Sequence, residues 1–524
     1  MSFKMKVLLA GFMFMFIHAL SLFANELFQE DGIFPNHSAE YVRTLNRNAS
    51  TEADATFYNP AGLTYLPKGL YVMFSNQTLH KKRTHVMDYY AIEADFTLNI
   101  GNIDNPVQPT TNSSAYTNRP TGSLESDNNY FTDITAPAMP DLNVVYRDQF
   151  KGHEYAIFFN LGVMQAAPDV TFPRGLAIID YGNLAVGEVS AKLVAFPGTA
   201  LETSQGPVTQ YTYESNIAVR TEYFIGNTIG VSYKIIDMLS ASLGFRFIYG
   251  MGRQTINVKN ATILHENQTD PLNLLPEENL FINNSDWNID TQYSGFGYGI
   301  ITGLHCQPIQ KLDIGLRYEY YFPMILTKKT NKFQVPAIIE ETGMLNIFKD
   351  GKANPDFNGG AGYSAGNGEK EFKGTYPQSI SLGMAYSIFK WLKVMSSGDI
   401  YLRHQVDLDG REKDFGIAYR AGGALEFLPN ADIKLSTGYS YYNPGIKNEK
   451  RNEIDPLLIS HTIGAGAGLK VNEGLEVTIG AFYTIYQSTT VYEVIHTTSV
   501  LNNVLGIING TAEATHYVKK ELAE

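Results

Sequence analysis

The chain contains a single cysteine, no long apolar run after its N-terminal residues and no basic cluster with interleaved aromatic residues. Because Cys306 has no second cysteine to pair with, an intrachain disulfide and a cysteine-based metal or redox site are excluded. Beyond residue 24 no stretch of about 18 apolar residues occurs, so membrane-spanning helices are excluded too. The formal net charge of -13 argues against nucleic acid as a partner. We expect no cofactor, no metal and no nucleic acid.

Catalytic motifs and tryptophan are also scarce. No His-Glu-x-x-His sequence occurs, and no Ser, His and Asp residues cluster at the spacing of a hydrolase, so we expect a protein that is not an enzyme. The 2 tryptophans contrast with 33 tyrosines and 30 phenylalanines, an abundance that suits the two lipid interfaces of a membrane barrel. The core of a large all-β enzyme is the alternative explanation of that composition.

The N-terminal residues have the pattern of a secretory signal. Lys4 and Lys6 precede an apolar run over residues 7–17, and the small residue Ala24 follows Leu22 and Phe23. This order predicts a signal peptide over residues 1–24 that is cleaved after Ala24. The alternative is an uncleaved anchor helix.

Apolar side chains alternate with polar or small ones along most of the remaining chain. Successive side chains of a strand point to opposite faces, so one face of such a run suits lipid and the other a wet lumen. In residues 312–322 one face carries Leu312, Ile314, Leu316, Tyr318, Tyr320 and Phe322, and the other carries Asp313, Gly315, Arg317, Glu319 and Tyr321. This pattern is typical of a membrane-spanning β-barrel, although a soluble sandwich shows it as well.

The joints between the runs distinguish the two folds. Outer-membrane barrels alternate short periplasmic turns with longer external loops, and here short joints alternate with long ones almost throughout. We predict an all-β fold: a 14-stranded antiparallel transmembrane β-barrel over residues 69–524. The predicted strands are 69–86, 139–148, 153–166, 211–235, 239–258, 287–307, 310–328, 374–388, 391–407, 413–428, 431–443, 459–472, 474–490 and 511–523.

The predicted inner face of the barrel is rich in small residues and carries recurrent charges. The small residues leave room for a plug or a ligand. A buried charge in such a lumen either binds a ligand or pairs with another charge to stabilise the barrel. The candidate polar residues of the lumen are Arg220, Arg246, Arg317 and Arg420.

Residues 25–68 precede the first strand and do not alternate. Within them, Pro60 lacks a backbone N–H and Gly62 permits a positive φ, so Asn59, Pro60, Ala61 and Gly62 are expected to form a tight turn. The stretch 49–63 resembles the hatch of the FadL/TodX family of outer-membrane transporters. Residues 376–386, 419–427 and 461–469 resemble the eighth, tenth and twelfth strands of that family. The resemblance implies that residues 25–68 are an N-terminal hatch plugging the lumen.

The resemblance also implies a route for a substrate. Apolar external loops capture a hydrophobic molecule, a lumenal pocket beside the hatch binds it, and a kinked third strand releases it sideways into the membrane. Gly162 is the candidate position for the kink. The candidate capture residues are Leu272, Leu274, Leu275, Leu280, Phe281, Ile338, Ile339, Leu345 and Phe348.

We therefore expect a monomer in the bacterial outer membrane that takes up long-chain fatty acids or similar hydrophobic molecules. Its expected partners are these small molecules or lipids, the outer-membrane lipid and the barrel-assembly machinery. A general diffusion porin and a surface-exposed structural protein are the alternatives. The last run, 511–523, alternates poorly and does not end in an aromatic residue as the family normally does.

Overall fold

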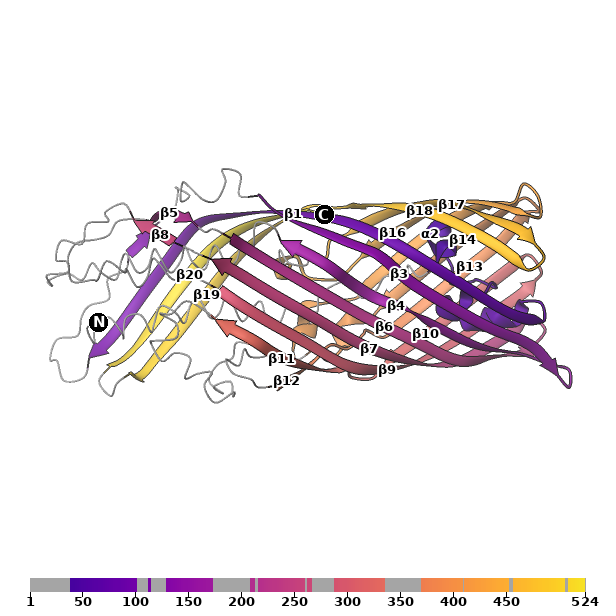
Figure 1. Ribbon diagram of the computed structural model, residues 1–524, viewed down its shortest axis with the longest axis horizontal. Helices are drawn as coiled ribbons and strands as arrows, with labels where there is room; N and C mark the ends of the chain where they lie inside the picture. Colours follow the sequence, from indigo (N-terminus) through magenta and orange to yellow (C-terminus); the bar gives the residue numbers. More distant parts are fainter. Residues whose placement is uncertain are drawn as a thin grey trace.

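The computed structural model is a long barrel of antiparallel β-strands with short helices inside it (Figure 1). No helix among the described residues is long and apolar enough to cross a bilayer. The structure describes residues 38–100, 112–114, 129–172, 208–212, 215–259, 262–265, 287–334, 369–408, 410–451, 456–504 and 508–523.

Eighteen strands share one sheet, and β5 (Val208–Thr212) and β8 (Thr262–His265) form a separate pair. The strands of the large sheet are β1 (Gly69–Ile100), β2 (Asn112–Ser114), β3 (Asn129–Phe150), β4 (His153–Phe172), β6 (Ser215–Ile236), β7 (Leu239–Lys259), β9 (Trp287–Ile309), β10 (Leu312–Tyr321), β11 (Ile325–Gln334), β12 (Glu369–Lys373), β13 (Ser379–Phe389), β14 (Leu392–Tyr401), β15 (Ala418–Phe427), β16 (Ile433–Asn443), β17 (Ser460–Asn472), β18 (Leu475–Tyr486), β19 (Thr489–Val504) and β20 (Ile508–Ala523).

The chain goes around the barrel by pairing each strand with the next in antiparallel fashion. β10 and β11 both pair with β9, so they are two parts of one passage that is interrupted around Pro323. β12 and β13 are likewise two parts of one passage, separated by a stretch that contains Pro377. β18 and β19 follow each other along the chain and form another such passage. With these merged and the short β2, β5 and β8 set aside, fourteen passages remain among the described strands. β20 pairs with β19 and with the part of β1 that begins at Thr84.

The predicted all-β barrel is confirmed, but several strand boundaries differ from the prediction. β1 continues to Ile100 and β3 begins at Asn129, where a loop over residues 87–138 was expected. With these extensions β1 and β3 are longer than the roughly 9–11 residues that cross a bilayer. β14 ends at Tyr401 and β15 begins at Ala418, because the 3-10 helices η4 (Arg403–Gln405) and η5 (Arg411–Asp414) fill the connection between them.

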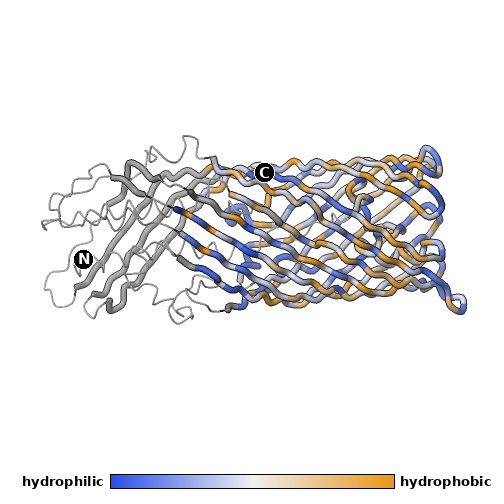
Figure 2. Tube along the Cα trace, viewed as in Figure 1, coloured by the Kyte–Doolittle hydropathy of each residue, from blue (hydrophilic) through white to orange (hydrophobic). Residues whose placement is uncertain are grey.

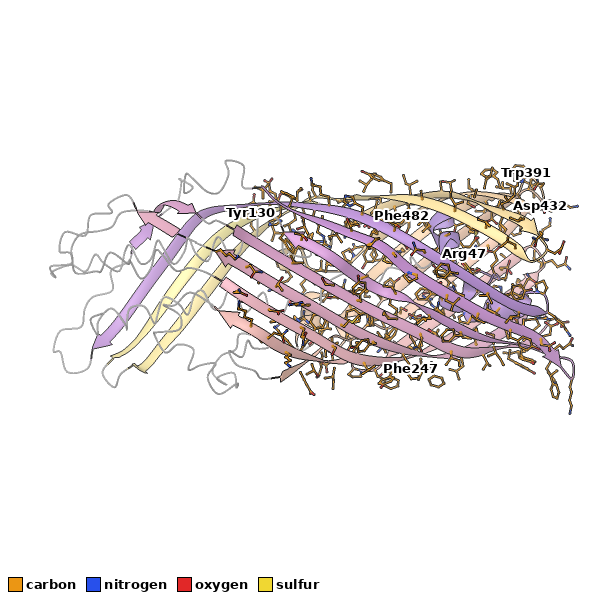
Figure 3. The ribbon with its side chains drawn as sticks, viewed as in Figure 1. Arg47, Tyr130, Phe247, Trp391, Asp432 and Phe482 are labelled. Carbon is orange, nitrogen blue, oxygen red and sulfur yellow. The ribbon has the colours of Figure 1, made fainter. Side chains whose placement is uncertain are left out.

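The predicted faces of the strands are confirmed where the structure describes them. On β7, Phe245 and Phe247 are half exposed, whereas Arg246 is buried inside. Apolar and polar residues alternate along the coloured parts of the wall strands (Figure 2), and Phe247 points away from the barrel while Arg47 lies within it (Figure 3). So much exposed apolar surface is unstable in water, and we conclude that this belt faces lipid.

Candidate functional site: the hatch and the lumen

Residues 38–66, here called the hatch, lie inside the barrel. They form α2 (Ala39–Thr44), α3 (Ala55–Tyr58) and η2 (Pro60–Tyr65), which are followed directly by β1. α2 contacts β15, β16, β17 and β18, whereas η2 contacts β4, β6, β7 and β9. Because these strands lie in different parts of the wall, the hatch reaches across the lumen.

Glycines on the inner face of the wall allow the hatch to approach closely. Added methyl groups at Gly315 of β10 and Gly383 of β13 would overlap the backbone of Asn48. On β16, a methyl group at Gly438 would overlap the backbone of Thr44 in the same way. The small residues that the sequence places on this face are therefore the surface on which the hatch packs.

The predicted hatch motif is held by side chains of the barrel. Ser232 Oγ donates a hydrogen bond to the carbonyl oxygen of Pro60 over 2.6 Å, and Ser240 Oγ donates to that of Ala61 over 2.6 Å. The side-chain amide of Asn59 donates to the carbonyl of Leu304 over 3.0 Å. These bonds satisfy polar groups that are buried away from water. The two serines were not singled out from the sequence, although strand alternation places both on the inner face.

Gly62 has a different role from the one expected. The motif does turn, since the backbone N–H of Gly62 donates to the carbonyl of Asn59 over 3.0 Å and Pro60 begins η2. However, Gly62 is absent from the positive-φ glycines of the described chain. A methyl group at Gly62 would instead overlap the carbonyl oxygen of Ser50. Glycine is therefore required for close packing within the hatch.

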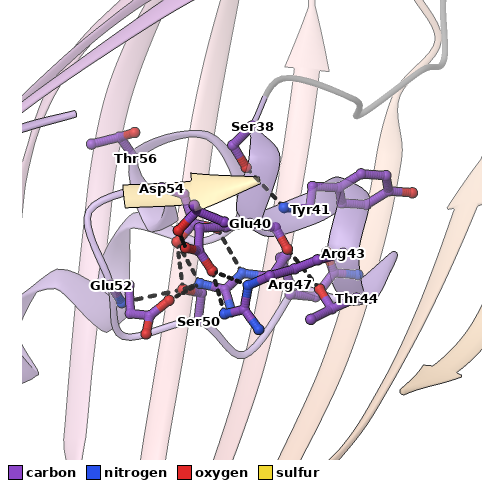
Figure 4. A network of polar contacts seen from close by, with 12 residues as sticks. Ser38, Glu40, Tyr41, Arg43, Thr44, Arg47, Ser50, Glu52, Asp54 and Thr56 are labelled. Carbon is purple, nitrogen blue, oxygen red and sulfur yellow. Dashed lines mark hydrogen bonds and ion pairs between the residues drawn. The ribbon is translucent and has the colours of Figure 1, made fainter. Parts of the chain in front are cut away.

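A network of charges stabilises the hatch (Figure 4). Arg47 binds Asp54 with two hydrogen bonds, from Nε over 2.6 Å and from Nη2 over 2.8 Å, and also pairs with Glu52. Lys434 of β16 reaches Glu52 over 2.7 Å and so links the network to the wall. Burial raises the pKa of the Glu52 carboxyl, but Arg47 and Lys434 outweigh it, and the pKa lies well below its usual value.

A second link between hatch and wall is made by Arg43. This fully buried side chain pairs with Glu40 of the same helix and with Glu426 of β15. Removing one member of such a buried group leaves an uncompensated charge, which is strongly destabilising. The hatch is therefore bound to the neighbouring strands β15 and β16 by ionic contacts as well as by packing.

Two of the four predicted lumenal arginines come together above the hatch. Arg246 and Arg317 both approach Glu319, over 3.2 Å and 3.6 Å. Arg317 also donates to the carbonyl of Phe57 over 2.6 Å, and Arg246 lies 4.9 Å from the centre of the Phe57 ring. This pair therefore bridges the wall and the hatch.

The other two predicted arginines lie apart from this pair. Arg220 binds Glu222 over 2.7 Å, and Arg420 lies 5.1 Å from the centre of the Tyr442 ring. A buried apolar group, here called the lumenal cluster, adjoins the Arg246 site and was not predicted as a unit. Its members are Met164, Phe224, Ile248, Tyr293, Tyr321, Met324, Leu326 and Tyr376.

The hydrogen-bonded pairing between β3 and β4 is interrupted next to the hatch. Gly162 pairs with Asp141, and the next pair along these strands is Ile134 with Val170. The unpaired stretch contains Pro137, Pro140 and Pro168, which have no backbone N–H to donate. On its other edge β4 also shifts register against β6 after Val163. Gly162, the predicted kink position, is thus the last paired residue before the interruption.

Several sequence predictions lie outside the described residues. These are the signal peptide over residues 1–24, the first part of the hatch segment over residues 25–37, and all nine candidate capture residues of the loops. One Gly-x-Ser-x-Gly sequence, residues 362–366, also lies there. The hydrolase motif places its serine between a strand and a helix, whereas here strand β12 begins at Glu369.

Fold and hatch together define this chain as a plugged β-barrel. No family model and no curated protein sequence matches it. Its fold is that of a FadL homologue from Pseudomonas aeruginosa, with a TM-score of 0.52 and 14% identity, covering 93% of this chain and 97% of that one. The fold thus agrees with the family resemblance read from the sequence.

Weaker likenesses accompany this match. The toluene transporter TodX of P. putida has a TM-score of 0.39 and 11% identity, over 91% of this chain and 94% of that one. The toluene transporter TbuX of Ralstonia pickettii has a TM-score of 0.40 and 10% identity, over 90% of this chain and 94% of that one.

Proposed function

We propose that this protein takes up hydrophobic small molecules passively across the bacterial outer membrane. The observation that carries the proposal has two parts. The hatch fills the lumen, and the pairing between β3 and β4 is interrupted beside it. The hatch hydroxyl of Thr56 contacts Asn143 of β3, two residues from the last pair at Asp141. A molecule stopped by the hatch therefore lies beside a weakly paired part of the wall.

Physical chemistry favours a sideways exit at this level. Transferring an apolar chain into water costs about 0.8 kcal/mol for each CH₂ group, and a direct path into the bilayer avoids this cost. We propose that external loops capture the substrate, that the lumenal cluster binds it, and that the gap beyond Gly162 releases it. The loop residues named from the sequence remain the predicted capture surface.

The lumen favours an uncharged substrate. Arg220 and Arg246 already bind carboxylates, and Arg317 donates to the carbonyl of Phe57 and to Ser381. A carboxylate ligand would have to compete with these acceptors, whereas a neutral molecule needs only the apolar lining. We therefore propose hydrocarbons or similar neutral molecules as the preferred substrates, ahead of fatty acids.

A general diffusion porin is the alternative function. It would need an open lumen, and the contacts of α2 and η2 with different parts of the wall argue against one. A purely structural surface protein would have no use for an apolar cluster beside a plug.

Uptake by cells tests the proposal. We expect bacteria producing the protein to accumulate a radiolabelled aromatic hydrocarbon several-fold faster than cells without it, and to gain less for a long-chain carboxylate. Met164→Glu places a charge in the lumenal cluster and should abolish the gain, whereas Ile229→Val on the lipid face should preserve it. Equal accumulation with and without the protein would refute the proposal.

A further inference from the structure

The side chain of Tyr376 extends across the lumen to β4. Tyr376 lies in residues 374–378, between β12 and β13, and its ring belongs to the lumenal cluster. The ring meets Phe224 edge to face with centroids 5.8 Å apart, and its centroid lies 5.6 Å from that of Tyr321. Its hydroxyl donates a hydrogen bond to Gln165 Oε1 of β4 over 3.2 Å. Around the wall, β6, β7, β9 and β11 separate β4 from β12, so this contact joins distant strands.

The orientation of the Gln165 amide is determined by its other partner. Gln165 Nε2 donates to Glu222, which also accepts from Arg220 over 2.7 Å and from the hydroxyl of Tyr293. The carboxylate that Arg220 binds can only accept hydrogen bonds, so the amide turns its NH₂ group toward Glu222. Its carbonyl oxygen then faces Tyr376. The lumen therefore contains a fixed hydrogen-bond acceptor beside aromatic rings.

The position of Tyr376 allows its side chain to be replaced. Residues 374–378 belong to no strand, and Pro377 has no backbone N–H with which to join a ladder. The contacts of Tyr376 within the cluster are those of a phenol: two neighbouring rings and one hydrogen bond. Gln165 also lies between Gly162 and Val170, the stretch of β4 that does not pair with β3. A molecule in the place of Tyr376 would therefore lie beside the proposed exit.

We propose that the space occupied by the Tyr376 side chain is a substrate subsite, and that it takes neutral aromatic molecules bearing a hydroxyl group, such as phenols. The molecule displaces Tyr376 and donates its own hydroxyl hydrogen to Gln165 Oε1. This inference rests on the proposed function and names the substrate class that the lumenal cluster prefers.

The Gln165 acceptor distinguishes between the molecules that could displace Tyr376. A phenol restores the hydrogen bond, whereas a hydrocarbon fills the apolar lining and leaves a buried acceptor without a partner. A carboxylate has only acceptors to offer, and it would meet the oxygen of Gln165. One hydrogen bond of this kind corresponds to a roughly two- to ten-fold difference in affinity. The order of preference is therefore phenol, then hydrocarbon, then carboxylate.

Equilibrium dialysis against the full-length protein in nanodiscs tests the subsite, with empty nanodiscs as the background. The probes are radiolabelled p-cresol, which has the shape of a tyrosine side chain, and 4-methylanisole, which has the same ring but no hydroxyl hydrogen. Tyr376→Ala removes the internal competitor and leaves a space of the shape of p-cresol. Tyr401→Ala is the matched control, since Tyr401 is also 8% exposed but packs with Ala418 and Tyr442 in a separate group.

We expect Tyr376→Ala to bind p-cresol at least about ten-fold more tightly than the wild type, because the site no longer has to be vacated. This variant should prefer p-cresol to 4-methylanisole by about five-fold, and adding Gln165→Met should remove the preference. Tyr401→Ala should bind p-cresol like the wild type. Every variant is first checked for the gel mobility of the folded barrel.

Two results would overturn the subsite. One is equal affinity of Tyr376→Ala for p-cresol and 4-methylanisole, a comparison that needs no second variant. The other is p-cresol affinity that does not rise in Tyr376→Ala. Because dialysis measures binding alone, its outcome is separate from that of uptake. Binding as described without faster entry into cells would refute the proposed function and leave the subsite, whereas uptake without a hydroxyl preference would refute the subsite alone.

Discussion

At the scale of single residues, the packing of the hatch against the inner wall depends on glycines, which have no side chain. Gly438 and Gly315 permit the hatch backbone to contact the strands, and Gly62 does the same within the hatch. Alanine at such positions requires either the strand or the hatch to shift. The glycines of the lumen therefore determine whether the barrel is plugged.

Gly438→Ala should loosen the hatch. Overpacking of this kind costs roughly 1–3 kcal/mol, because the new methyl group meets the rigid backbone of Thr44. We expect faster cleavage of the hatch by added protease in detergent-solubilised protein. Gly398→Ala is the matched control, since its nearest neighbour would be a carbonyl at 3.8 Å, an ordinary contact. Equal cleavage of both variants would contradict the packing argument.

Glu52 should make the stability of the hatch depend on pH. The pKa of Glu52 in the folded protein lies well below its usual value. Its contribution to the stability of the hatch is therefore present above about pH 4.3 and is lost as the pH falls through the folded-state pKa. Glu52→Gln should lower the free energy of unfolding at pH 7 by less than about 1 kcal/mol, because the carboxylate is partly exposed. The unfolding temperature should fall accordingly.

The same variant should lose less stability than the wild type when the pH is lowered from 7 to 3.5. Thermal unfolding curves of both proteins at the two pH values measure this difference. If both lost the same amount, Glu52 would not be the titrating group.

At the scale of elements, the gap between β3 and β4 is the proposed exit. Pro140→Cys and Val163→Cys would place thiols immediately beyond the last pair, Asp141 with Gly162. Joining these thiols with a short bismaleimide in a Cys306→Ser background should reduce hydrocarbon uptake at least five-fold, because the exit can no longer widen. The control is Tyr146→Cys with Ile157→Cys, within the paired region. Unchanged uptake after complete cross-linking of the first pair would exclude this exit.

The sequence predicts elements better than it predicts their registers. Along β10 the alternation alone assigned Arg317 and Glu319 to the lumen, and both are buried there. The role of Gly62 could not be predicted, because it depends on Ser50 in a neighbouring loop. The position of β20 depends on which stretch of the long β1 it pairs with, and the poor alternation of residues 511–523 specifies the register weakly.

At the scale of the whole molecule, the lipid-facing belt, the filled lumen and the interrupted pairing of β3 and β4 are the parts of the path that we propose for apolar molecules. Removing residues 38–66 should convert the barrel into an open channel, because the wall glycines that contact the hatch backbone would then face empty space. In planar bilayers we expect steady conductance from this variant and little from the intact protein. Similar conductance from both would mean that the hatch does not close the lumen.

The central claim is that the barrel passes hydrophobic molecules and excludes polar ones. The most direct measurement is the entry of a hydrocarbon and of a small sugar into the same proteoliposomes, with a hydrocarbon-binding protein enclosed. We predict that the intact protein accelerates hydrocarbon entry several-fold and leaves sugar entry at the level of protein-free vesicles. Acceleration of both solutes, or of the sugar alone, would contradict this claim.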